Sequence, residues 1–194
     1  MGLDQYLCKV SEVTDRELKM LQYRSIYNLP STKRCSFCAI PCDDSNSIAE
    51  IKHLCKKAMF IKYDTDMEQI CLDFNIPKDA QCTGFGSSPE GYHYTFKYDD
   101  KETRVQLSEQ EIDKYTLYSP VECYVYKTQE IAYWRKNYTL DDAMRASSQK
   151  SVGNCEYVVC NEEMLQLAVD EGVSYEDIAL EDNEKSEICY YIWY

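Results

Sequence analysis

The stretch Cys35-Ser-Phe-Cys38-Ala-Ile-Pro-Cys42 places three cysteines within eight residues. Two thiolates in a C-x2-C spacing can hold one tetrahedral ion from a single turn, and zinc sites use this spacing. We expect a tight loop here, because Pro30 and Ser31 interrupt the preceding pattern. The stretch therefore predicts a structural zinc site that includes Cys35, Cys38 and Cys42. Free thiols scattered through a cytosolic protein are the alternative.

The segment that follows contains a candidate for the fourth zinc ligand. Ser47-Ile-Ala-Glu50 has the pattern of a helix-starting capping box, and the apolar residues after it recur at helical spacing. We predict a helix with Cys55 on its inner face as the fourth zinc ligand. His53 lies about 200° round that helix from Cys55, which disfavours a shared ion. Cys55 also fits a core position, and the residues that could instead complete the site are Cys42, Cys71, Cys82 and His53.

The charge of the chain is concentrated near its end. The net charge is −13, and residues 153–194 hold one basic residue, Lys185, against eleven Asp and Glu. Such a segment repels nucleic acid and attracts a basic surface, so we expect a protein partner and no direct contact with nucleic acid. A solvated acidic face that serves solubility is the alternative.

The cysteine content indicates a reducing compartment. The eleven cysteines are odd in number, and the first residues include no apolar run typical of a signal peptide. No apolar run approaches the roughly 18 residues of a membrane span. We therefore expect a cytoplasmic protein without a membrane partner.

Alternating and helical patterns predict an α+β fold. Capping boxes at Thr14–Glu17 and Ser108–Glu111 predict helix starts, and residues 92–98 and 103–107 predict a hairpin. Strands separated unevenly by helices favour a largely antiparallel sheet with flanking helices. We expect a single domain over 1–194, with residues 30–82 as a zinc-stabilised insertion or subdomain.

The sequence favours a protein that is not an enzyme. It contains two histidines, His53 and His93, and neither stands in an H-E-x-x-H or a zinc-deaminase motif. A cysteine-rich metal set is typical of a closed, structural site. The alternative is a cysteine-dependent enzyme or redox protein that uses the Cys35-x2-Cys38 loop.

Two separate stretches resemble a group of uncharacterised phage and prophage proteins. Met1-Gly-Leu-Asp-Gln-Tyr-Leu7 is similar to their M-G-L-D-x-Y-L opening, and Tyr133-Trp-Arg-Lys136 matches their Y-W-R-K motif. Gly153-Asn-Cys-Glu-Tyr157 and Glu162-Glu-Met-Leu165 are similar to the segments that follow. The resemblance covers the first ten residues and about 129–168, and the A-N-A-I-H-like run that usually follows Y-W-R-K is absent. Residues 20–120 look like an insertion.

The resemblance implies a phage origin and carries no activity. A small acidic phage protein with a structural metal is similar to zinc-containing type II-A anti-CRISPR proteins, which inhibit Cas9 by binding its protein surface. We therefore expect an inhibitor that acts in the bacterial host cytoplasm and binds a basic surface of Cas9 or of another nucleic-acid-handling protein, blocking DNA loading or cleavage. A phage protein without a host target is the alternative.

Overall fold

The computed structural model describes residues 3–32, 34–44, 46–148, 150–181 and 185–193 and has an α+β fold with antiparallel sheets, as the sequence predicts. The chain divides into two compact units. The first comprises Met1–Ile61 and Pro120–Tyr194, and the second comprises Lys62–Ser119. The expected insertion at 30–82 has different bounds from this second unit. No helix in the described part of the chain is long and apolar enough to cross a membrane.

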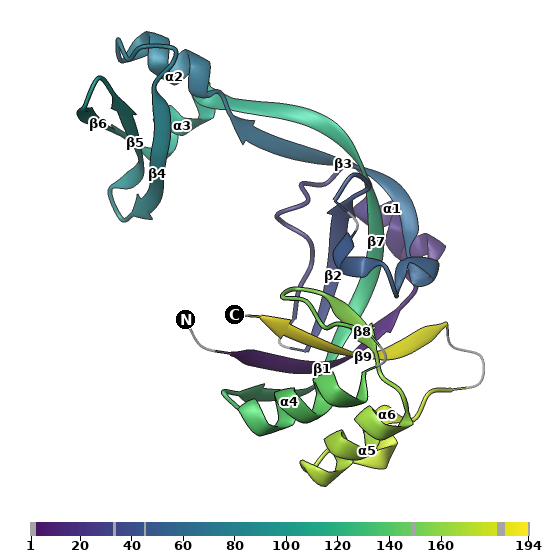
Figure 1. Ribbon diagram of the computed structural model, residues 1–194. Coiled ribbons are helices and arrows are strands. Elements are labelled where there is room, and N and C mark those ends of the chain that lie inside the picture. Colours follow the sequence, from purple (N-terminus) through teal and green to yellow (C-terminus); the bar gives the residue numbers. More distant parts are fainter. Residues whose placement is uncertain (1–2, 33, 45, 149, 182–184, 194) are drawn as a thin grey trace. The chain divides into compact units, whose positions relative to one another are not determined.

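The first unit is built on one curved antiparallel sheet (Figure 1). Its strand order is β2-β7-β1-β9-β8, and β3 also pairs with β7. The bounds are β1 Asp4–Ser11, β2 Cys35–Pro41, β3 Lys56–Thr65, β7 Thr116–Arg135, β8 Tyr157–Val159 and β9 Ser186–Trp193. Strands β3 and β7 extend from the first unit into the second.

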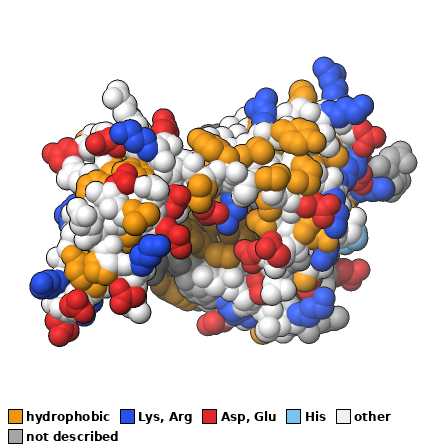
Figure 2. All heavy atoms as spheres, turned by 90° about the horizontal axis from the view of Figure 1, so that it is seen from above, with side chains coloured by type: hydrophobic (Ala, Val, Ile, Leu, Met, Phe, Trp, Pro, Cys, Tyr) orange, Lys and Arg blue, Asp and Glu red, His pale blue; other side chains and the backbone are white. Residues whose placement is uncertain are grey.

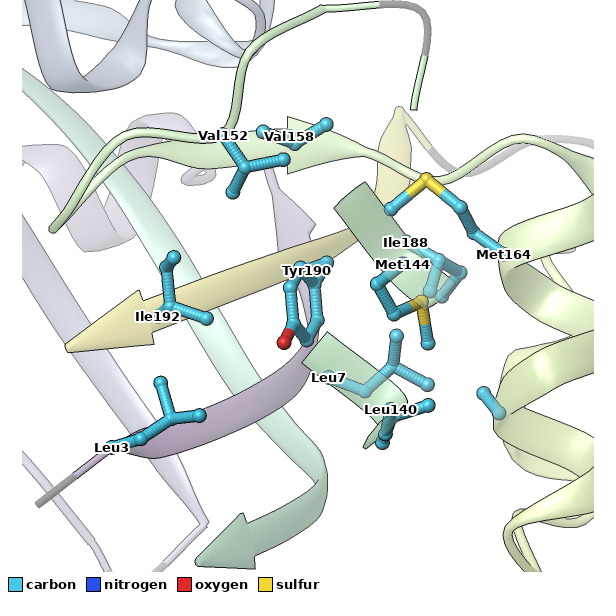
Figure 3. Close-up of a cluster of buried hydrophobic side chains, with 11 residues drawn as sticks. Leu3, Leu7, Leu140, Met144, Val152, Val158, Met164, Ile188, Tyr190 and Ile192 are labelled. Atoms are coloured by element: carbon cyan, nitrogen blue, oxygen red, sulfur yellow. The ribbon is translucent and has the colours of Figure 1, made fainter. Parts of the chain in front are cut away.

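Alternation along the central strands separates two faces of this sheet. Leu7 of β1 and Ile188, Tyr190 and Ile192 of β9 pack under helices α4 (Tyr138–Ser147) and α5 (Glu162–Asp170). Figure 3 shows the cluster that they form, in which Tyr190 of β9 lies close to Leu7 of β1 and to Met144 of α4. The opposite face packs against two short 3-10 turns, Asn46–Ile48 and Lys52–Leu54. Burial on both faces explains the apolar run Ile188–Ile192 of β9.

A buried hydrogen-bond network joins α4 to the sheet. The Nε2 group of Gln5 donates to the Tyr190 hydroxyl at 2.9 Å and to the Asn137 carbonyl at 3.0 Å. The Tyr190 hydroxyl in turn donates to Oδ1 of Asp141 at 2.9 Å, and Asp141 pairs with Arg145 at 2.9 Å. Gln5 and Tyr190 are fully buried. Each polar group therefore has a partner where water is excluded, which buried polar groups require.

Tyrosines in register tie four strands together on the other face. Tyr6 lies opposite both Tyr133 and Tyr191, and Tyr191 lies opposite Tyr157. Their ring centroids are 5.0, 6.0 and 4.8 Å apart along this row. Aromatic cross-strand pairs stabilise a sheet by about 0.2–1 kcal/mol each, so the row accounts for part of the high tyrosine content.

The second unit is a three-stranded sheet with two short helices. Strands β4 (Gln81–Ser88), β5 (Gly91–Tyr98) and β6 (Lys101–Leu107) pair in that order. Helices α2 (Met67–Asp73) and α3 (Glu109–Ile112) and the 3-10 turn Asp113–Tyr115 pack beside it. The hairpin predicted at 92–107 is confirmed, and Asp99 and Asp100 make its turn with positive φ angles.

Local signals predict the helix starts and miss several strands. The capping boxes at Thr14 and Ser108 are confirmed, with α1 at Asp15–Leu21. The loop expected at 35–42 is wrong, because 35–41 pairs with β7 as strand β2. The helix expected after Ser47 is also wrong, because two 3-10 turns and then β3 occupy 46–65. Strand β4 at Gln81–Ser88 is not among the predicted elements.

We predict that Tyr190→Phe lowers the free energy of unfolding by about 1–3 kcal/mol. The substitution keeps the ring and removes one buried hydrogen bond from Gln5 and one from Asp141, and a buried polar atom that loses its partner is costly. Chemical denaturation measures the change. Tyr23→Phe is the control, because Tyr23 is exposed. Equal stability of the two variants would contradict the importance of the network.

Candidate functional site

The cysteines predicted to bind zinc lie in and around strand β2. Cys35 and Cys38 are three positions apart within the strand, so their side chains leave opposite faces. Sγ of Cys38 lies 3.9 Å from Oγ1 of Thr128, against the buried cluster under the 3-10 turns. A zinc knuckle needs both thiols on one side of a turn. The strand geometry does not fit that arrangement.

Cys42 and Cys55 lie outside β2. Cys55 packs against the same cluster as Cys38, and its thiol donates to the Ile51 carbonyl at 3.4 Å. The structure therefore brings Cys38 and Cys55 to one cluster and does not bring Cys35 or Cys42 there. Over the described ranges, no group of three or more His, Cys, Asp or Glu side chains could hold a metal ion. Zinc binding stays a prediction from the sequence.

The alternative ligands are dispersed. His53 is exposed, with its Nε2 atom 3.4 Å from Oε1 of Glu187. Cys71 is buried in α2 and Cys82 is exposed on β4, and both belong to the second unit.

Burial suppresses ionisation of the thiols near β2. Loss of hydration raises the pKa of Cys38 and of Cys42, and it raises the pKa of Cys55 to about 12. A nucleophilic cysteine needs a lowered pKa. The thiols of Cys38, Cys42 and Cys55 therefore lack the lowered pKa of a nucleophile.

Other cysteines lie in and beside the central strands β1 and β9 without a motif that identifies them. Cys8 of β1 lies opposite Cys189 of β9. Burial raises the pKa of Cys8 and of Cys160 to about 12, and it raises the pKa of Cys189 as well. Sequence reasoning missed this grouping, because only the strand register brings Cys8 and Cys189 together.

The strongest charge feature is a surface formed by α5 and α6 (Tyr175–Ile178) with the residues that follow them. We call it the acidic surface, and its seven carboxylates are all exposed: Glu162, Glu163, Asp170, Glu171, Glu176, Asp177 and Glu181. None forms an ion pair with a base among the described residues, whereas Lys56, Lys57, Lys127 and Lys150 elsewhere all do. Two further acids of this segment, Asp182 and Glu184, lie outside the described residues.

The sequence of α5 fixes which side chains face solvent. The Asn161 side chain accepts from the Met164 backbone N–H at 3.0 Å and caps the start of the helix. Met164 and Ala168 are one turn apart and fully buried in the cluster of Figure 3. The exposed positions at the two ends of the helix carry carboxylates, with Glu162 and Glu163 before Met164 and Asp170 after Ala168. Packing of one helix stripe therefore presents the acidic surface in a fixed orientation on the first unit.

Two carboxylates of this surface stand where the helix itself disfavours them. Asp170 is the last residue of α5 and Glu171 is its C-cap. The C-terminus of a helix carries partial negative charge, so each position would be better filled by a base, by about 0.3–1 kcal/mol. Two side-chain amides offset part of this cost. Gln166 donates to Asp170 at 2.8 Å, and Asn137 donates to Glu171 at 3.0 Å. The chain thus keeps acidic residues against local stability.

Apolar groups accompany the acids. Tyr175 and Leu180 are 64% and 40% exposed, and the Tyr175 hydroxyl donates to Oε1 of Gln166 at 3.1 Å. The face drawn in Figure 2 differs, because Lys and Arg side chains there lie among Asp and Glu. Charge counting along the sequence located the acidic segment, but exposure of Tyr175 and Leu180 could not be read from it.

Comparison with known proteins found no matching family model, no matching curated protein and no matching solved structure.

The zinc site predicted from the sequence requires about one zinc ion per chain in native protein purified without chelator, whereas the opposite faces on which Cys35 and Cys38 leave β2 predict less than one. Elemental analysis measures the ratio, with circular dichroism before and after chelation as the check on folding. One zinc per chain that disappears in Cys35→Ser/Cys38→Ser would contradict this geometry and support the site predicted from the sequence.

Thiol labelling of the folded protein should modify exposed Cys82 first and leave Cys38, Cys55 and Cys189 unmodified at neutral pH. Their raised pKa values keep the reactive thiolate scarce, and access is limited by the burial of Cys189 and the partial burial of Cys38 and Cys55. Mass spectrometry of timed samples gives the order, with unfolded protein as the control in which all thiols react. Fastest labelling at Cys38 or Cys42 would instead favour the cysteine-dependent enzyme.

Proposed function

We propose that the protein is a non-enzymatic interaction protein whose acidic surface binds a basic surface of a nucleic-acid-handling protein. The observation that carries this proposal is the set of seven exposed carboxylates on α5, α6 and the residues after them, without an ion-paired base among the described residues. A partner that supplies the missing bases would gain charge-assisted hydrogen bonds, and Tyr175 and Leu180 would supply apolar contact.

The helix geometry supports a role beyond solubility. A solubilising acid can stand anywhere on a surface, whereas Asp170 and Glu171 occupy the least favourable end of α5. Residues kept against local stability are typical of functional sites. The buried stripe of α5 fixes the carboxylates in advance, which lowers the entropy lost on binding.

Cas9 is the partner to test first. The resemblance at the start of the chain and at Tyr133–Lys136 supports a phage origin, and Cas9 holds its nucleic acids in positively charged channels. Binding of the acidic surface in such a channel would compete with DNA and so inhibit loading or cleavage. Another basic bacterial protein of this kind fits the same chemistry.

We predict that Asp170→Lys/Glu181→Lys weakens binding to purified Cas9 by about tenfold or more while keeping or raising thermal stability. Both side chains are exposed, and a lysine at the end of α5 suits the helix. Exposed ion pairs contribute about 0.2–1 kcal/mol each, and reversal replaces attraction with repulsion. Affinity is measured by calorimetry across a salt series, and binding should weaken as salt rises.

The matched control is Asp79→Lys/Glu102→Lys, which makes the same change in net charge in the second unit. It should bind nearly as tightly as the native chain. Equal loss in both variants would show that only total charge matters. Absence of any complex at low salt would remove Cas9 as the partner.

A further inference from the structure

Strand β4 has one open edge. Its hydrogen-bonded neighbour is β5 alone, and no backbone hydrogen bond joins residues 82–88 to any other described part of the chain. Six of its eight residues are exposed. A row of unpaired backbone N–H and C=O groups is a template for another strand, and proteins usually block it.

The sheet edges of the first unit are covered. Residues 30–32 lie along β2, where the Phe37 N–H donates to the Pro30 carbonyl at 3.1 Å. Residues 23–26 lie along β3, where the Tyr23 N–H donates to the Met59 carbonyl at 2.8 Å. Strand β8 is three residues long, and the Glu50 carboxylate accepts from its Val159 N–H at 2.8 Å. Each edge is thus closed to a further strand.

The two edges of the second unit differ in charge. Strand β6 carries Lys101, Glu102 and Arg104, which is the usual protection of an edge. Strand β4, Gln81-Cys-Thr-Gly-Phe-Gly-Ser-Ser88, carries no charge and no proline. Phe85 in its middle is 63% exposed, with its ring centroid 5.1 Å from that of Tyr94. In this unit the protection found on β6 is missing from β4.

We propose that β4 pairs antiparallel with β4 of a second copy of the chain, so that the two three-stranded sheets become one continuous sheet about a two-fold axis. The composition of β4 indicates that its partner strand is a second β4. An uncharged strand meets its own copy without like charges in opposition, and a residue near its middle meets the same residue across the axis. Phe85 would then pack beside the Phe85 of the second copy and extend the ring cluster with Tyr92 and Tyr94.

Salt should affect this dimer and the acidic surface in opposite directions. The second unit, residues 62–119, holds six Lys and Arg against twelve Asp and Glu, a net charge of −6. Two copies repel each other, so screening by salt strengthens their pairing. Binding of a basic partner to the acidic surface weakens with salt. The two proposals can therefore fail independently.

Sedimentation equilibrium of the full chain in reducing buffer, over a wide concentration range, tests the pairing. We expect a concentration-dependent rise from the monomer mass of 22.7 kDa to twice that value. Phe85→Lys should abolish the rise, because two lysines would face each other near the axis. Ser87→Lys, which removes no apolar packing, should do the same. Gln106→Lys on the charged edge β6 is the matched control and should dimerise like the native chain.

Hydrogen exchange gives a second readout. The outer amides of β4 should exchange more slowly as concentration rises, and those of β6 should not change. A native chain that stays monomeric with fast exchange along β4 would overturn the proposal and leave the edge to a strand of another protein. Dimers that persist in both Phe85→Lys and Ser87→Lys would also overturn it, because the contact would then lie elsewhere.

Discussion

The hydrogen bonds among Gln5, Tyr190 and Asp141 are the constraint on which the first unit depends. They satisfy a glutamine and a carboxylate in a region without water, between the sheet and α4. Gln5 also bonds both backbone groups of Asn137, the N-cap of α4. Because apolar packing alone would allow α4 to slide on the sheet, these directional bonds define its position.

The same buried cluster also fixes the position of α5 relative to α4. Met144 of α4 and Met164 and Ala168 of α5 are fully buried together. Asn137 links the two helices again, since its Nδ2 group donates to Oε2 of Glu171 at 3.0 Å. A buried network thus supports an exposed charged surface at a distance. Gly172 allows the chain to turn after α5, because its φ of +95° lies in a region that side chains disfavour.

The sequence predicted those parts of the fold that depend on interactions between neighbouring residues, such as helix caps and tight turns. The caps at Thr14 and Ser108 need only a few neighbouring residues, and both are confirmed. The hairpin at 92–107 was predicted from alternation on both sides of a short turn, and it is confirmed. The concentration of acids near the chain end located the acidic surface, because helix periodicity leaves those positions outside.

Pairing between distant segments determines the rest, and no short window contains it. The C-x2-C spacing is compatible with a zinc-binding turn and also with a strand. Pairing with β7 makes residues 35–41 a strand. Residues 48–59 follow a helical stripe, yet Ala58 and Phe60 alternate inward once Lys56–Thr65 joins β7. The direct measurement of the central claim is hydrogen exchange of the first unit with and without Cas9 at low salt. The account predicts slower exchange of backbone amides across residues 162–181 in the complex. Protection confined to other segments, with 162–181 unchanged, would contradict it.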